Sequence, residues 1–85
     1  MNLFIISAAY LDNSKYDSLY NYPDVKITYF DYYDDYSKIK HLNIRSFLPT
    51  IIILDENYKE LKRFMNNTDI SEVEMFLKNR GNEKC

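Results

Sequence analysis

The feature that most restricts the fold of this chain is the apolar run at residues 50–54, Thr-Ile-Ile-Ile-Leu, which Pro49 precedes. A run of this length, bounded by a proline and by the polar segment 55–58, is typical of a β-strand. It is apolar on both faces, and such strands are covered on both sides by other layers. We therefore predict a central strand at residues 50–54, in a sheet that packs against helices.

The N-terminal half of the chain shows the same alternation of strand and helix patterns. Leu3 to Ala8 is a second, almost unbroken apolar run of strand length, and Val25 to Phe30 is rich in β-branched and aromatic residues. Between them, residues 12–14 offer N-cap side chains for a short helix that ends before Pro23. The expected inner face of that helix comprises Leu11, Tyr16, Leu19 and Tyr20.

A second helix is predicted after Phe30, because the acidic segment 31–35 suits the positive end of a helix dipole. Ile39 and Leu42 are its expected anchors, and it should end near Asn43. After the run at residues 50–54, residues 55–58 predict a hairpin turn. Lys59 to Met65 is the expected returning edge strand, with a bulge because its apolar residues do not alternate cleanly.

The last element is a helix from about Asp69 to Arg80. Asp69 is the expected N-cap with Glu72 in the first turn, and Gly81 is a plausible C-cap. The apolar positions that follow recur at helical spacing. The order β-α-β-α-β-β-α predicts an α/β fold with a four-stranded mixed sheet. With 85 residues we expect one domain at 1–81 and a flexible C-terminal tail at 82–85.

Composition excludes several classes of function. Gly81 is the only glycine, so neither of the glycine-rich nucleotide-binding loops can be present. A net charge of −2 provides no basic surface for nucleic acid. The longest apolar run is too short to span a membrane, and the N-terminus lacks the basic region of a signal peptide.

The single cysteine, Cys85, allows no internal disulfide, which fits a cytoplasmic protein. Abundant Tyr, Asn, Lys and Ile suit an AT-rich genome, such as that of a low-GC bacterium or its phage; for a viral protein the expected location is the host cytoplasm.

The order of elements, together with residues 44–50 (Ile-Arg-Ser-Phe-Leu-Pro-Thr), resembles the thioredoxin family. This resemblance implies a minimal, glutaredoxin-sized domain in which Pro49 is cis and faces the functional site. The family's Cys-x-x-Cys motif would fall at about Tyr10-Leu11-Asp12-Asn13, where this sequence has no cysteine. One extra residue before Pro49, and Met65 or Asn66 in place of a glycine, are further departures from the family pattern.

Without a dithiol, the resemblance implies the scaffold but not the reaction, because dithiol exchange needs an attacking thiolate and a resolving thiol. Cys85 is a single thiol, interpreted as incidental. His41, the only histidine, is interpreted as a surface residue rather than as part of a catalytic triad. Asp31, Asp34 and Asp35 lack the spacing of a calcium loop. We therefore expect no catalytic residue, no metal and no cofactor.

The leading hypothesis is a redox-inactive protein-binding module, as a phage or bacterial accessory or inhibitor protein. Its partner is expected to be another protein, with no nucleic acid or membrane involved, and the chain itself to be a monomer or weak dimer. The alternative is an oxidoreductase-derived protein that uses Cys85 or a partner's thiol. The expected binding groove beside the proline comprises Tyr10, Leu11, Asp12, Asn13, Phe47, Leu48, Pro49 and Met65.

The nine tyrosines leave two interpretations open. They can replace Phe and Leu in a small core, with their hydroxyls reaching its rim. They can also form an exposed aromatic patch, since tyrosine is enriched in protein interfaces.

Overall fold

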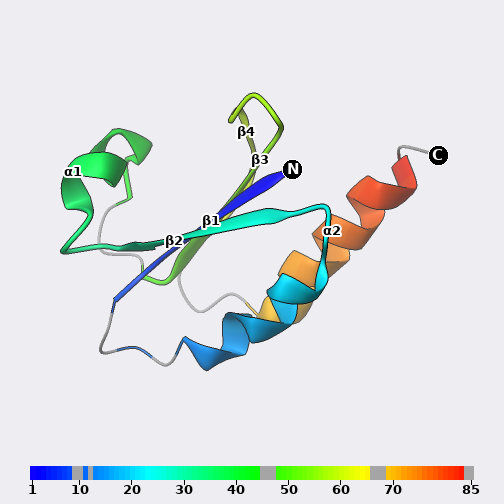
Figure 1. Ribbon diagram of the computed structural model, residues 1–85, viewed down its shortest axis with the longest axis horizontal. Coiled ribbons are helices and arrows are strands. Elements are labelled where there is room, and N and C mark those ends of the chain that lie inside the picture. Colours follow the sequence, from blue (N-terminus) through cyan, green and yellow to red (C-terminus); the bar gives the residue numbers. More distant parts are fainter. Residues whose placement is uncertain (9–10, 12, 45–47, 66–68, 84–85) are drawn as a thin grey trace.

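The computed structural model of the chain (Figure 1) describes residues 1–8, 11, 13–44, 48–65 and 69–83, without the side chains of residues 80–83. Its elements follow the predicted order, with the two N-terminal helices formed largely of 3-10 turns (η). They are β1 (Asn2–Ser7), η1 (Ser14–Asn21), β2 (Lys26–Asp31), α1 (Tyr36–Ile39), η2 (Lys40–Leu42), β3 (Thr50–Leu54), β4 (Glu60–Met65) and α2 (Ile70–Glu83).

The four strands form one mixed sheet in the order β2-β1-β3-β4. β1 pairs in parallel with β2 and antiparallel with β3, and β3 pairs antiparallel with β4. The two apolar runs are thus the central strands, and every residue of β3 is buried. The predicted α/β fold with a four-stranded mixed sheet is confirmed.

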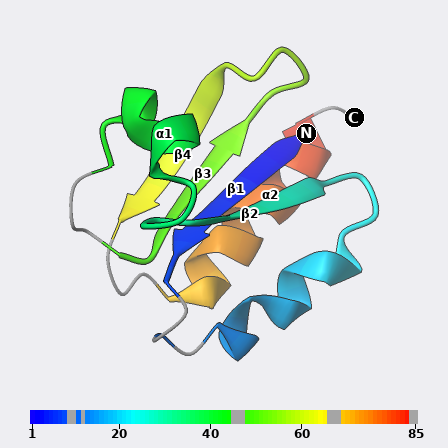
Figure 2. The same ribbon diagram turned by 60° about the vertical axis from the view of Figure 1, so that its left-hand side comes forward.

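Helices cover both faces of the sheet (Figure 2). The alternation of side chains along β3 divides the core into two clusters. Ile51 and Ile53 belong to a cluster on the face of η1 and α2, together with Leu19 and Val73. Ile52 and Leu54 belong to a second cluster on the opposite face, which α1 covers through Ile39. Two apolar faces on one strand therefore require two helical layers, as the run at 50–54 predicts.

The predicted edge strand and its bulge are present. The register between β3 and β4 shifts at Ile53/Leu54, so that Lys62 pairs with Ile53 and Glu60 pairs with Leu54. Leu61 is the extra residue, and it packs against the core on the α2 face. The bulge explains why Leu61 and Phe64 do not alternate: both lie on the α2 face, although they are three positions apart and would lie on opposite faces of a regular strand.

The second helix is shorter than predicted, because the acidic segment folds as a turn. One carboxylate oxygen of Asp31 accepts hydrogen bonds from the backbone N–H groups of Tyr33 and Asp34, at 2.9 and 3.0 Å. Such side-chain bonds compete with helical ones. α1 therefore begins only at Tyr36, and the helical segment ends at Asn43, whose φ of 57° is left-handed.

Two details of the predicted helices are wrong. Tyr20, expected on the inner face of the first helix, is 61% exposed, because the 3-10 turn places it away from the buried Tyr16 and Leu19. Gly81 does not end the last helix, which continues to Glu83 and so includes two residues of the expected tail. Lys84 and Cys85 lie outside the described residues. Asp69 does cap this helix, since its carboxylate accepts a hydrogen bond from the Ser71 N–H at 3.0 Å.

Candidate functional site

The sheet register brings the expected site segments to one end of the sheet. Ile6 pairs with Thr50, and Thr50 pairs with Met65. The next residues beyond this row are Ser7 at the end of β1 and Pro49 before β3. The peptide bond between Leu48 and Pro49 is cis. The turn after β1, the segment before β3 and the end of β4 therefore meet at the same end of the sheet.

Five of the predicted site residues are described there, and we refer to them together as the Pro49 surface. Met65 is 50% exposed, while the other four are partly buried. Leu48 packs against the core cluster on the α1 face, whereas Asn13 lies on the η1 face, so the surface wraps around the end of the sheet. Tyr10, Asp12 and Phe47 lie outside the described residues. The members of the Pro49 surface are Leu11, Asn13, Leu48, Pro49 and Met65.

Asn13 ties the turn after β1 back to that strand. Its Oδ1 accepts a hydrogen bond of 2.6 Å from the Ser7 hydroxyl, and its Nδ2 donates to the Ala8 carbonyl oxygen at 3.2 Å. The same Nδ2 donates a longer bond of 3.4 Å to the Tyr29 hydroxyl. Asn13 is the N-cap residue of η1 by position, but its side chain makes no capping hydrogen bond. The resemblance assigns position 13 to the second cysteine of the motif. In this chain Asn13 occupies it, and its amide connects the turn to β1 through hydrogen bonds.

Tyr29, whose hydroxyl contacts this amide, and Tyr16 both have a pKa above that of a free tyrosine. Burial, followed by the charge of Asp31, raises the pKa of Tyr29, against the opposing effect of its hydrogen bonds with Ser7 and Asn13. Burial, followed by the proximity of Tyr29, raises the pKa of Tyr16 to about 12. The Tyr16 hydroxyl is buried without a hydrogen-bond partner among the described residues.

Nothing in this group provides an activated nucleophile. A tyrosine with a raised pKa is neutral near pH 7. The buried Ser7 hydroxyl donates its hydrogen bond to the Asn13 amide oxygen, which cannot act as a base and so does not activate it. His41 is exposed on η2. Across the described ranges, no three His, Cys, Asp or Glu side chains lie close enough to hold a metal ion. The described residues of the Pro49 surface can offer apolar contacts and hydrogen bonds to a ligand.

Sequence reasoning placed Asn13 at this site but missed Ser7, Tyr16 and Tyr29 as its neighbours. The available signal was Ser7, a lone hydroxyl side chain within an otherwise apolar run and six residues before Asn13. Among the described tyrosines, Tyr16 is buried in the core, and Tyr22 and Tyr32 are partly buried against it, as the core interpretation expects. The other five are exposed. Tyr32 contacts both Tyr33 and Tyr36 edge to face, with ring centroids 5.3 and 5.5 Å apart.

Comparison with known proteins gives a structural match but no match in sequence. No protein-family model matches the chain, and no curated protein does either. Among solved structures, the chain is similar to thioredoxin 1 from the thermophilic eubacterium Thermosipho africanus, with a TM-score of 0.77 and 26% sequence identity. The match covers 95% of this chain and 99% of that one, so it includes the whole domain. No helix in the described part is long and apolar enough to cross a membrane.

Proposed function

We propose that this chain, which has a thioredoxin-like fold, is a redox-inactive module that binds another protein through the Pro49 surface. The observation that carries the proposal is the occupant of the expected redox position. Asn13 stands there and is hydrogen-bonded to Ser7 and Ala8, while cis-Pro49 and its apolar neighbours remain partly exposed. The thioredoxin-like scaffold supports a role in presenting a polypeptide, and the sequence has no Cys-x-x-Cys pair that would react with one.

The first expected result concerns redox activity. The purified chain should not accelerate the reduction of insulin by a small thiol reductant above the uncatalysed rate, because it has one cysteine and no resolving thiol. Cys85→Ser should give the same rate as the wild type. Turnover in the wild type that is lost in Cys85→Ser would instead favour the alternative, an oxidoreductase-derived protein that works through a single thiol.

The apolar members of the Pro49 surface suit a protein partner. Leu48 and Met65 expose apolar area next to the backbone at the start of β3 and the end of β4, where an extended segment can lie. Methionine is enriched in protein interfaces and adapts to varied shapes. The small size of the chain and a composition that suits an AT-rich genome motivate a narrower form of the proposal, an accessory or inhibitor protein of a phage or low-GC bacterium.

The second expected result concerns partner binding. Met65→Lys should remove the bound partner in affinity purification with mass spectrometry, because a charge would be buried in the contact. Tyr58→Lys is the matched control, since Tyr58 has similar exposure and lies in the turn between β3 and β4, at the opposite end of the sheet from the Pro49 surface. Leu48→Ser provides a second variant, with folding checked by circular dichroism. Retention of every partner by folded Met65→Lys and Leu48→Ser would refute the proposal.

A further inference from the structure

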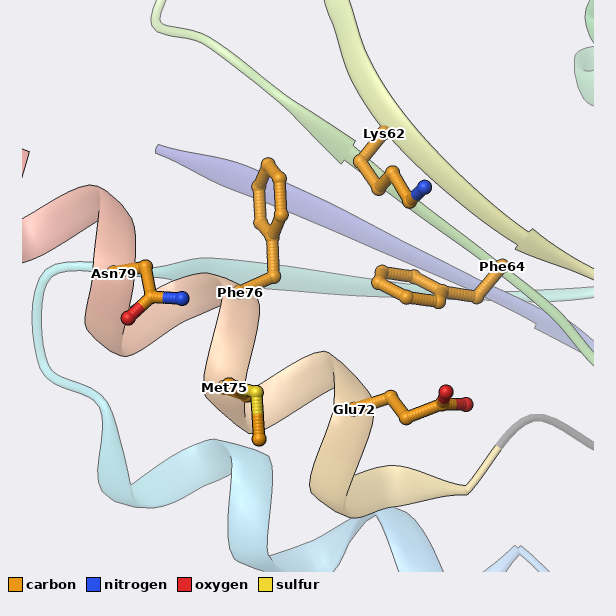
Figure 3. A pocket seen from close by; sticks show the side chains of 6 residues that line it. All are labelled: Lys62, Phe64, Glu72, Met75, Phe76 and Asn79. Carbon is orange, nitrogen blue, oxygen red and sulfur yellow. The ribbon is translucent and has the colours of Figure 1, made fainter.

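A second surface, distinct from the Pro49 surface, lies where β4 faces α2. Figure 3 shows a hollow between the two elements, with Lys62 and Phe64 on the strand side. The rings of Phe64 and Phe76 meet edge to face at 6.3 Å, and Met75 is 62% exposed beside them. The hollow measures about 250 Å³, and we name it the β4–α2 hollow after its lining residues Lys62, Phe64, Glu72, Met75, Phe76 and Asn79.

The size of the hollow favours a side chain over a small molecule. Sites that enclose a whole ligand measure roughly 300–1,000 Å³ and are largely closed. This hollow is smaller and open at its mouth, and its apolar walls are two phenylalanine rings and a thioether. One apolar side chain of another polypeptide fits such a space.

The strand beside the hollow can position that side chain. β4 is the last strand of the sheet order, and in the described part of the chain no strand pairs with its outer edge. Unpaired N–H and C=O groups along an edge are the template for an added strand. Lys62 and Phe64 project on the same face of β4, so a paired strand would place alternate side chains next to them.

The charged side chains near the hollow indicate which side chains an added strand should carry. On the far face of β4, Arg63 is neutralised by Glu60 through two bonds of 2.7 and 3.1 Å. Lys62 has no ion pair among the described residues, and its Nζ lies 5.6 Å from the centroid of the Phe64 ring. Glu72 lies in the first turn of α2, where the helix dipole offsets its charge. Within β4, the charge that lies beside the hollow and has no ion pair among the described residues is therefore the Lys62 cation.

We propose that the β4 edge binds an extended segment of another protein by strand addition. An apolar side chain of this segment fills the β4–α2 hollow, and a carboxylate two residues away lies opposite Lys62. Antiparallel pairing, the slightly more stable mode, gives the segment the order apolar-x-acidic. This site does not depend on the Pro49 surface or on its function.

A second copy of this chain fits the same edge poorly. Of the two registers of longest overlap between two β4 strands related by a twofold axis, one places Lys62 opposite Lys62 and the other places Lys62 opposite Phe64, so neither brings a carboxylate opposite Lys62. Like charges directly opposite each other destabilise a strand pair. A heterologous segment with a carboxylate replaces this repulsion by attraction.

The test is an NMR titration of the isotope-labelled full-length chain with two synthetic peptides. One contains Phe-Thr-Glu flanked by threonine and valine, and the other contains Phe-Thr-Lys in the same frame. We expect the first to shift the backbone amides of β4 and those of Met75 and Phe76 on α2. Lys62→Glu should weaken binding of the glutamate peptide about five- to tenfold and strengthen binding of the lysine peptide. Lys26→Glu, a matched change on the opposite edge strand β2, should alter neither affinity more than about twofold.

Three outcomes would overturn this inference. One is the absence of shifts in β4 and α2 at millimolar glutamate peptide. Another is an equal response to both peptides in the wild type and in Lys62→Glu. The third is a dimer in light scattering whose dissociation moves the β4 resonances, which would assign the edge to a second copy. Shifts confined to residues near Leu48 and Pro49 would count against the β4 edge while supporting the Pro49 surface.

Discussion

Replacing Tyr16 with phenylalanine is expected to stabilise the protein, by about 1 kcal/mol near neutral pH. The Tyr16 side chain is 3% exposed, and its hydroxyl has no hydrogen-bond partner among the described residues. Such a group loses its bonds to water on folding and gains none in return. Phenylalanine keeps the ring that packs in the core and removes the hydroxyl. For a domain of this size the melting temperature should rise by about 4–8 °C.

The advantage of Tyr16→Phe should grow in alkaline solution. The pKa of Tyr16 is raised from 10.0 in the unfolded chain to about 12 in the folded protein. The folded state therefore favours the neutral phenol, and below pH 10, where Tyr16 is neutral in both states, its ionisation takes nothing from the free energy of unfolding. As the pH rises from 10 through 12, the unfolded chain ionises first and the wild type loses stability. The difference between variant and wild type should increase by about 1 kcal/mol at pH 11 and about 2 kcal/mol at pH 12.

The measurement is denaturant unfolding followed by circular dichroism at pH 8, 10 and 11, with wild type and variant compared at each pH. Tyr20→Phe is the matched control, since it removes the same hydroxyl from an exposed residue of the same helix. The control should follow the wild type at every pH. A Tyr16→Phe variant that is less stable than the wild type at pH 8 would show that the hydroxyl is satisfied in solution. A difference that does not change with pH would contradict the raised pKa.

The strands and the last helix could be predicted because local pattern and tertiary demand agree there. Residues 50–54 are apolar on both faces, and only a central strand buries both. Asp69 precedes residues with helical spacing and does cap the last helix. The irregular spacing of Leu61 and Phe64 predicted the bulge, because an extra residue returns both side chains to one face.

The middle of the chain could not be predicted in detail, because short polar side chains can bond in several ways. Asp31 was expected to favour a helix start, yet its carboxylate bonds to nearby backbone N–H groups and delays the helix to Tyr36. Residues 12–14 were expected to offer an N-cap side chain for the first helix, but Asn13, the N-cap by position, bonds instead to Ser7, which the sheet places close by. The sequence pattern identifies which polar side chains can make such hydrogen bonds. Which partner each side chain bonds to depends on the groups that the folded chain brings close to it.

The Asn13 side chain should be the most costly polar group to remove at the Pro49 surface. In Asn13→Ala, the fully buried Ser7 hydroxyl loses its acceptor and the Ala8 carbonyl loses a donor. We expect the free energy of unfolding to fall by about 1–3 kcal/mol, because two hydrogen bonds in a buried setting are lost while Ser7 keeps its bond with Tyr29 and Ala8 keeps that from the Leu11 N–H. Asn21→Ala is the matched control on the last residue of the same helix, exposed to solvent, and should cost less than about 0.5 kcal/mol.

Hydrogen exchange of the amides adjoining the turn separates this prediction from general destabilisation. Because Asn13 bonds to Ser7 and Ala8, its loss should release the Leu11 amide, which donates to the Ala8 carbonyl at 3.0 Å, more than the amides of β3. A uniform loss of protection would indicate that Asn13 supports the whole fold instead. Unchanged stability in Asn13→Ala would show that the Ser7 hydroxyl finds another acceptor. The Asn13 side chain would then not be the group that holds the turn after β1 in place. In this fold the amide would hold the turn after β1 by non-covalent bonds alone, so its removal should leave the sheet intact and loosen the Pro49 surface.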